Sequence, residues 1–125
     1  MDTDIIIPIY NAFDFTKKCI ETVIEHTDLT KHTLLLINDK STDQRILPLL
    51  NLFTTEYPSL NITIINNESN QGFVRTVNIG MQHSSRDVVL LNSDTEVTKN
   101  WLPYMEECLQ DFKEWYGLKS PFDGF

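Results

Sequence analysis

Four short apolar runs alternate along the chain with longer segments in which apolar residues recur every three or four positions. The short runs span residues 4–8, 33–37, 61–65 and 87–91, and the longer segments span about residues 14–27, 46–53, 73–83 and 100–115. Short runs rich in β-branched residues are typical of buried strands, and the three-to-four spacing predicts helices with one buried face. The pattern therefore predicts a parallel sheet covered by helices on both sides.

Two prolines and the last residues affect the predicted boundaries. Pro8 is expected to end the first strand, because proline cannot donate a hydrogen bond to a sheet. Pro48 leaves the start of the second helix open, since a proline inside a helix removes a hydrogen bond and clashes with the preceding turn. A fifth strand is an open alternative for residues 117–125.

The expected fold class is a Rossmann-like, three-layer α/β/α domain with a mostly parallel sheet in strand order 3-2-1-4, because right-handed crossovers restrict the topology. In this order the connections leaving strands one and four diverge, and ligands bind outside the carboxyl ends of the strands at such a point. Polar clusters follow three strands at that edge: Pro8–Asn11, Asn38–Asp39 and Asn92–Asp94. We expect these clusters to form one site.

Composition narrows the class of protein. A chain of 125 residues predicts one domain, and its formal net charge of −8 argues against a nucleic-acid partner, which requires a basic face. No apolar run approaches the roughly 20 residues of a transmembrane helix, so no transmembrane segment is expected. The acidic start at Met1–Asp4 is unlike a signal peptide, so we expect a cytoplasmic protein, with peripheral attachment to a membrane left open.

The cysteines and histidines are assigned structural roles. Cys19 and Cys108 fall on the apolar sides of predicted helices and are expected to be small buried side chains. His26, His32 and His83 lie at or near predicted helix ends, where surface or capping roles are expected, away from the proposed crevice.

The familiar phosphate-binding motifs are missing, since the sequence contains neither Gly-x-Gly-x-x-Gly nor a Walker-type Gly-Lys-Ser/Thr. Carboxylates are the remaining candidates. Asp94 offers a hard oxygen ligand to Mg²⁺ or Mn²⁺, or caps the following helix. Asp39 accepts hydrogen bonds from a base or ribose, or caps its own following helix. Tyr10 stacks on a base or packs internally, and Arg75 reaches a phosphate or stays solvated.

Four motifs in one order extend this interpretation: Ile-Pro-Ile-Tyr-Asn (7–11), Ile-Asn-Asp-Lys-Ser-Thr-Asp (37–43), Asn-Gln-Gly-Phe-Val-Arg-Thr-Val-Asn-Ile-Gly (70–80) and Leu-Leu-Asn-Ser-Asp-Thr-Glu-Val (90–97). Over about residues 4–103 the chain resembles family-2 glycosyltransferases of the GT-A fold. The resemblance implies inverting transfer of a sugar from a nucleotide diphosphate donor, with UDP or dTDP as the nucleotide, to a hydroxyl of a carbohydrate or lipid-linked saccharide. It also implies a Mg²⁺ or Mn²⁺ ion on the diphosphate and a place in polysaccharide biosynthesis.

The resemblance also implies roles for particular residues. Pro8 and Tyr10 would frame the nucleobase pocket, and Asp39 would contact the base. Asn92–Asp94 matches the Asp-x-Asp motif, in which Asp94 would be the metal ligand. The full donor-binding set expected from the sequence is Pro8, Tyr10, Asn11, Asp39, Asn70, Gly72, Arg75, Asn78, Asn92, Ser93 and Asp94.

Two departures from the family pattern limit the expectation. Asn38 and Asn92 stand where family members usually carry acids, which suggests a changed ribose contact. Family members also continue into an acceptor-binding half that supplies the catalytic base, whereas only about twenty residues follow Pro103 here. The late acids, which lie in no recognisable base motif, are Asp111, Glu114 and Asp123. We therefore expect residues 1–125 to form a single donor-binding domain without an acceptor half, and the catalytic residue stays unassigned.

A second class of function stays open beside the enzyme. The chain could be a non-catalytic nucleotide-sugar-binding or protein-interaction module, which self-associates through apolar surface that a second half would cover. The residues expected on that surface are Trp101, Phe112, Trp115, Phe122 and Phe125.

Overall fold

The computed structural model describes residues 2–116, with side chains described as far as residue 111. Strands and helices alternate along this range: β1 (Thr3–Ile9), α1 (Phe13–His26), β2 (Thr33–Asn38), α2 (Ile46–Glu56), β3 (Ile62–Asn66), α3 (Phe73–His83), β4 (Asp87–Leu90) and α4 (Trp101–Tyr116). The strands form one parallel sheet in the order β3-β2-β1-β4. The predicted fold class and strand order are confirmed.

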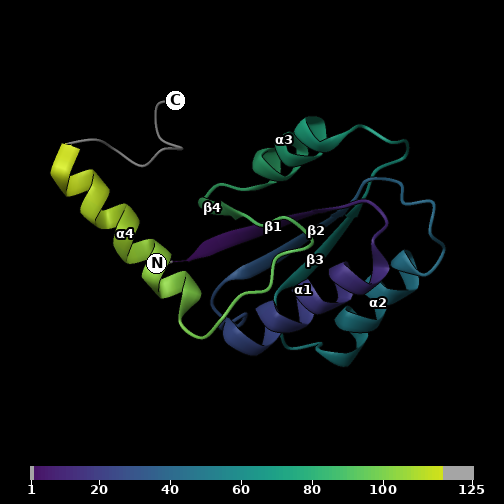
Figure 1. Ribbon diagram of the computed structural model, residues 1–125, viewed down its shortest axis with the longest axis horizontal. Coiled ribbons are helices and arrows are strands. Elements are labelled where there is room, and N and C mark those ends of the chain that lie inside the picture. The colour runs from purple at the N-terminus through teal and green to yellow at the C-terminus, as the bar shows by residue number, and fades with distance from the viewer. Residues whose placement is uncertain (1, 117–125) are drawn as a thin grey trace.

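The helices cover the sheet in three layers. Figure 1 shows α1 and α2 on one face, α3 on the other, and α4 extending away from the sheet. Alternate residues of β1 face the two layers: Ile5 belongs to the larger core with α1 and α2, and Ile6 to the smaller core under α3. All seven residues of β1 are buried, which is why a central strand reads as an unbroken apolar run.

Helix α3 lies very close to the sheet at Gly80. A Cβ atom added there would lie 2.7 Å from Cδ1 of Ile37 and 2.9 Å from Cγ2 of Ile6. Both distances are shorter than ordinary van der Waals contact, so a larger residue at Gly80 would force Ile6 and Ile37 to shift. This close approach packs α3 directly against β1 and β2.

The two prolines have clear structural consequences. Pro8 does not end β1, which continues to Ile9 and pairs Pro8 with Ile37 of β2. The pairing of β1 with β4 ends at Ile6, so at Pro8 strand β1 pairs with β2 but not with β4. A proline is tolerated at such a position. Pro48 is the third residue of α2, in the first turn, where backbone N–H groups need no partner within the helix.

Three predictions about individual side chains are wrong. Cys19 is buried as expected, but Cys108 is exposed on α4, although Glu106 of the same helix still accepts a hydrogen bond from the Thr3 hydroxyl. Trp101 is half-buried and its indole Nε1 donates a hydrogen bond to Oγ1 of Thr27 at 2.8 Å, so it is not part of an open apolar surface. His32 is buried and is not a surface or capping residue. The other residues expected on that surface lie outside the described side chains.

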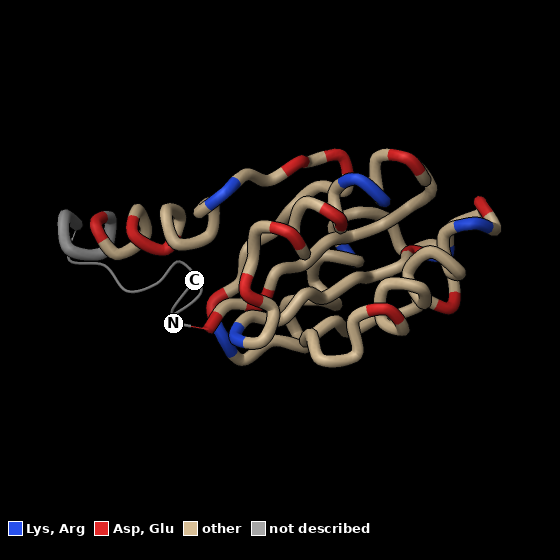
Figure 2. The backbone as a smooth tube through the Cα atoms, turned by 90° about the horizontal axis from the view of Figure 1, so that it is seen from below, with Lys and Arg blue, Asp and Glu red and all other residues tan. Residues whose placement is uncertain are grey.

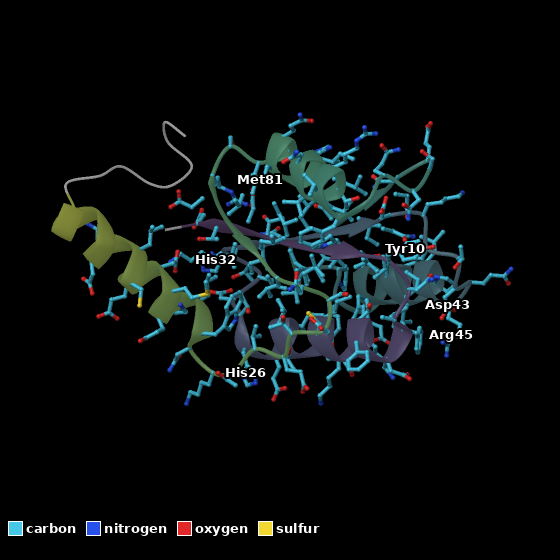
Figure 3. All side chains as sticks on the ribbon, turned by 45° about the horizontal axis from the view of Figure 1, so that its top comes forward. Tyr10, His26, His32, Asp43, Arg45 and Met81 are labelled. Atoms are coloured by element: carbon cyan, nitrogen blue, oxygen red, sulfur yellow. The ribbon has the colours of Figure 1, made fainter. Side chains whose placement is uncertain are left out.

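His32 belongs to a polar network at the amino ends of the strands. Its Nδ1 accepts a hydrogen bond from the backbone N–H of Thr3 at 3.0 Å. Burial lowers the pKa of His32, although Glu106 acts in the opposite direction. Nearby, Arg86 forms an ion pair with Asp4 and donates to Thr33 Oγ1 at 2.6 Å. Figure 3 shows His26 and His32 far from Tyr10, so these two histidines lie away from the carboxyl ends of the strands.

Two global features complete the fold. Figure 2 shows the basic positions scattered along the backbone among more numerous acidic positions. No helix within residues 2–116 combines the length and apolar character needed to cross a membrane. The fifth strand considered for residues 117–125 falls outside the described residues.

Candidate functional site

A cleft of about 690 Å³ opens at the carboxyl ends of β1 and β4, at the point where the connections leaving the strands diverge. Eight of the residues expected from the sequence line it: Pro8, Tyr10, Asp39, Asn70, Gly72, Asn92, Ser93 and Asp94. The structure also adds five residues that were not in the expected donor-binding set: Ile9, Ala12, Phe15, Phe73 and Thr76. The polar ends of β1, β2 and β4 therefore meet in one place.

Three expected residues lie outside this lining. Arg75 and Asn78 are exposed on α3. Phe73 and Thr76 face the cleft from the same helix, three residues apart and hence on one side of it. Arg75 lies two positions after Phe73, as Asn78 lies two after Thr76, and residues at that spacing point to different sides of a helix.

Asn11 braces the rim of the cleft. Its side-chain amide donates to Oγ1 of Thr42 at 2.9 Å and accepts from the backbone N–H of Asp43 at 2.9 Å. Its own backbone N–H donates to Oγ of Ser41 at 3.0 Å. Asn11 also has a φ of 55°, a left-handed conformation that asparagine tolerates better than most residues. The structure therefore gives Asn11 the task of joining the loop after β1 to the loop after β2.

Asp39 lies between the end of β2 and the loop before α3. Its side chain is buried, and Oδ1 accepts hydrogen bonds from Asn67 Nδ2 at 2.9 Å and from the backbone N–H of Gln71 at 2.7 Å. Oδ2 accepts from the backbone N–H of Gly72 at 3.0 Å. Burial acts to raise the pKa of Asp39, but these hydrogen bonds outweigh burial and bring the pKa below its ordinary value. Asp39 is thus an ionised side chain that fixes the 67–72 loop.

The same loop sets the start of α3. Gly72 has a φ of 85° and a ψ of 168°, a conformation essentially restricted to glycine. Its carbonyl accepts from the backbone N–H of Thr76 at 3.0 Å, and the Thr76 hydroxyl accepts from Asn67 Nδ2 at 3.1 Å. Asn70 Nδ2 donates to the Asp39 carbonyl at 3.2 Å. The positive end of the α3 dipole is therefore held at the cleft, where it favours an anion.

Helix α1 supports the segment that follows β4. The Cys19 thiol donates to the Asn92 carbonyl at a sulfur–oxygen distance of 3.7 Å, and burial raises the pKa of this thiol to about 11, so it keeps its proton. Further along, the Val97 backbone N–H donates to Thr22 Oγ1 at 3.1 Å. Asp94 lies between these two anchors and is exposed in the cleft. The buried anchors leave its carboxylate available to a ligand.

The oxygen donors in the cleft fit a hard divalent cation such as Mg²⁺. Asp94 supplies one carboxylate, and Asn92 and Ser93 line the same cleft with an amide and a hydroxyl. Across the described residues, no three His, Cys, Asp or Glu side chains are grouped to hold a metal. Mg²⁺ and similar ions are commonly held by one or two carboxylates together with substrate phosphates and water. The donor set therefore fits an ion that arrives with a diphosphate.

Two exposed aromatic side chains in the cleft come from helix starts. Phe15, in the first turn of α1, is 63% exposed, and Phe73, the first residue of α3, is 55% exposed. Helical periodicity assigns Phe15 to the apolar side of its helix, whereas it gives Phe73 only as the start of the next one. The signal available in the sequence is their position, because helices that follow parallel strands begin at the carboxyl edge of the sheet.

The strand order β3-β2-β1-β4, with a cleft at its switch point, is that of the GT-A fold. Residues 4–114 match the model of the glycosyl transferase family 2, and the chain belongs to this family. A relative in Bacillus subtilis (strain 168), the uncharacterized glycosyltransferase YwdF, is 29% identical over 96 residues, which are 77% of this chain and 33% of that protein.

Solved structures share the fold at low sequence identity. The mannosyltransferase PcManGT from Pyrobaculum calidifontis, in complex with GDP-Man and Mn²⁺, matches with a TM-score of 0.67 at 19% identity, over 74% of this chain and 27% of that one. S. aureus TarS 1–349, in complex with UDP-GlcNAc, matches with a TM-score of 0.71 at 20% identity, over 89% and 32%. The chain therefore spans about a third of the length of these proteins.

Proposed function

We propose that the described residues form the donor-binding part of an inverting glycosyltransferase. The cleft takes a nucleotide diphosphate sugar, with UDP or dTDP as the nucleotide and Mg²⁺ or Mn²⁺ held between Asp94 and the diphosphate. The acceptor is a hydroxyl of a carbohydrate or lipid-linked saccharide, in polysaccharide biosynthesis. PcManGT and TarS, which were solved with GDP-Man and UDP-GlcNAc, support a sugar nucleotide in this fold.

The observation that carries the proposal is the meeting of three strand ends around one cleft. The β4 end presents the exposed carboxylate of Asp94, and the β1 end presents Tyr10, which is 47% exposed. The β2 end supplies Asp39, which fixes the loop before α3. A divalent ion, when bound, neutralises negative charge on the departing diphosphate. The α3 N-terminus adds a fixed positive dipole end beside the same cleft.

Neither of the two carboxylates in the cleft is assigned as the general base for transfer, because each has another role. Asp39 accepts three hydrogen bonds from its own chain, and Asp94 is assigned to the metal. Asp111 is exposed on α4, and the side chains of Glu114 and Asp123 lie outside the described residues. We therefore propose that residues 2–116 bind the donor and that the general base for transfer comes from elsewhere. A transfer assay with this chain alone should then give no turnover above donor hydrolysis.

Binding is tested by thermal unfolding of the chain with UDP, dTDP, GDP or ADP, each with and without Mn²⁺. A ligand at about 100 times its dissociation constant adds about 2.7 kcal/mol to the free energy of unfolding, which raises the melting temperature by several degrees. The Asp94→Ala variant should lose the part of the rise that depends on Mn²⁺. Its melting temperature without ligand should not change, because Asp94 is exposed.

Glu96→Ala is the matched control. Glu96 is an exposed acid two residues after Asp94, and it does not line the cleft. This variant should keep the full Mn²⁺-dependent rise. If none of the four nucleotides raises the melting temperature of the wild type, the proposed function is wrong.

A non-catalytic interaction role is the second candidate. Tyr104 and Met105 on α4 are 68% and 45% exposed, and Leu90 at the end of β4 is 39% exposed. Exposed apolar side chains of this kind favour association. Light scattering at increasing protein concentration tests it, and a monomer at every concentration would contradict self-association.

A further inference from the structure

Three small polar residues are buried at every third position of α1, where successive residues are neighbours on the helix surface: Thr16, Cys19 and Thr22. Burial alone would favour apolar side chains at these positions. Instead, each hydroxyl or thiol bonds to the backbone of a segment beside the cleft. The Thr16 hydroxyl donates to the Asn11 carbonyl at 3.2 Å, in the loop after β1. The other two bond to the segment after β4, which carries Asp94.

Asp94 is the third residue of a β-turn that begins at Asn92. A hydrogen bond from the Thr95 backbone N–H to the Asn92 carbonyl closes the turn at 3.0 Å. The Cys19 thiol donates to the same carbonyl, so one oxygen atom joins the turn to α1. Because Ser93 and Asp94 are the two central residues, the direction of the Asp94 carboxylate follows from the orientation of this turn.

The segment is also held on both sides of the turn. Before the turn, the Leu91 backbone N–H donates to the Ile6 carbonyl of β1 at 2.9 Å. After the turn, the Val97 backbone N–H donates to Thr22 Oγ1 at 3.1 Å. The Thr22 hydroxyl in turn donates to the Cys19 carbonyl at 2.9 Å, which links the two attachments on α1. The tip of the turn is therefore exposed while its attachments are buried.

We propose that Cys19 and Thr22 are positioning residues for the metal ligand Asp94, and that they act by fixing the 92–95 turn to α1. This inference rests on the proposed function and deepens it. Where one carboxylate supplies most of the protein's contribution to an ion, its direction decides how well the ion is held. Neither Cys19 nor Thr22 belongs to the four sequence motifs that indicated the cleft.

The attachments on α1 lower the cost of ordering the turn. Strand β4 is four residues long, and within residues 2–116 it pairs with β1 alone. A loop after such a short edge strand gains little order from the sheet, so fixing it to α1 saves binding free energy when the ion arrives. A nucleotide that binds without the ion makes no use of the Asp94 carboxylate. The gain in affinity that Mn²⁺ adds is therefore the quantity that Cys19 and Thr22 should change.

The first experiment measures the dissociation constant of UDP with and without Mn²⁺ in Thr22→Val and Thr22→Ser; dTDP, GDP or ADP replaces UDP if it raises the melting temperature more. Valine matches threonine in shape but offers no acceptor to the Val97 N–H, whereas serine keeps the hydroxyl. Thr22→Val should lose about tenfold of the gain from Mn²⁺, the lower end of the usual range for residues that orient a metal ligand, and should bind the nucleotide alone within about twofold of the wild type. Thr22→Ser should keep most of the gain. Equal weakening of Thr22→Val with and without Mn²⁺ would overturn the positioning role.

The second experiment separates positioning from a general loss of stability. Cys19→Ala removes the donor to the Asn92 carbonyl and should also reduce the gain from Mn²⁺. Leu50→Ala is the control, because Leu50 is fully buried in the same core but lies on α2. It should lower the melting temperature and keep the full gain. A gain reduced in Leu50→Ala as much as in Thr22→Val would overturn the positioning role, since any loss of stability would then suffice.

The third experiment detects release of the turn without a ligand. In a Cys108→Ser background Cys19 is the only thiol, and it is fully buried. A thiol reagent should modify Cys19 in Thr22→Val faster than the global unfolding of that variant allows, because the turn opens locally. In Leu50→Ala, modification should keep pace with the global unfolding measured in urea. Modification of Thr22→Val at the rate of its global unfolding would show that Thr22 does not hold the turn.

The outcomes for the proposed function and for the positioning role are distinct. If the wild type binds none of UDP, dTDP, GDP and ADP, or binds them without any effect of Mn²⁺, both are wrong. If the wild type shows the gain from Mn²⁺, and Thr22→Val and Cys19→Ala both retain it, the positioning role alone is wrong.

Discussion

Similar polar residues lie at the two ends of the sheet, but they differ in whether the protein supplies their partners. At the amino ends, Asp4, Arg86 and His32 satisfy one another or the backbone, and they join β1, β2 and the loop before β4. At the carboxyl ends, Asp39 fixes a loop while Asp94 stays exposed in a cleft. Polar residues at a strand end therefore act in folding or in binding according to whether the chain itself provides their partners.

This comparison predicts that substitutions at the amino ends lower the stability of the protein but do not change its affinity for the ligand. The largest effect is expected from Arg86→Met, which removes the cation from Asp4 and leaves its carboxylate the hydrogen bond from the Ser84 hydroxyl; the Asp4 side chain is only 11% exposed. An unpaired buried charge costs about 3 kcal/mol, and urea unfolding should show a loss of that order. The nucleotide dissociation constant of the folded variant should not change.

Arg45→Met is the matched control for Arg86→Met. Arg45 forms the other close Asp–Arg pair, with Asp43 at 2.8 Å, but its side chain is 63% exposed. Water solvates the Arg45 guanidinium there, so the free energy of unfolding should change little. Similar losses of unfolding free energy in Arg86→Met and Arg45→Met would show that burial does not make one ion pair more important for stability than the other.

A smaller effect is expected at the carboxyl ends from Gly72→Ala. A Cβ atom at Gly72 meets nothing within 4 Å, so the cost comes from the backbone, whose φ of 85° and ψ of 168° exclude other residues. We expect a loss of about 1–3 kcal/mol together with weaker nucleotide binding, because the loop and Phe73 move. Gly72→Asn should be no better than alanine, since asparagine tolerates only the left-handed helical region. A stable, tightly binding alanine variant would contradict this.

The smallest effect is a pH dependence from His32. Burial lowers its pKa in the folded protein, so between that pKa and the ordinary value near 6.5 the unfolded chain binds more protons. Stability then rises with pH through this window and is lost as the pH falls through the folded pKa. Thermal unfolding between pH 5 and 8 measures it. His32→Asn offers an acceptor oxygen to the Thr3 N–H without titrating, and it should flatten the profile. An unchanged profile would remove His32 as the cause.

Much of the fold could be predicted because the apolar pattern reports burial directly. The runs at residues 4–8 and 33–37 become central strands buried on both faces. The sequence predictions failed where tertiary packing outweighed a rule based on neighbouring residues. Pro8 stays in β1 because the β4 register reaches only Ile6, and Cys108 is exposed because the body of the protein covers α4 only in part. Neither setting can be read from neighbouring residues.

The candidate site divides in the same way. Strand-end motifs placed Asp39, Asn92 and Asp94 at one edge, and the cleft contains all three. Arg75 and Asn78 belong to the same motif as Gly72 but point from another side of α3. Phe15 falls on the apolar side of its helix by periodicity, yet it is exposed in the cleft, as is Phe73 at the start of α3. Helix rotation about its axis therefore decided which motif residues face the cleft.

The sequence by itself determined the layer architecture, the strand order and the edge at which polar groups gather, because these follow from hydrophobic periodicity and right-handed crossovers. Only the tertiary structure decided what each polar group does there. Asp39 and Asp94 are the same residue type at equivalent strand ends, but Asp39 is buried under three hydrogen-bond donors and Asp94 is exposed. The donors come from residues 67–72, about thirty positions away in the chain, and only folding brings them to one carboxylate and not to the other.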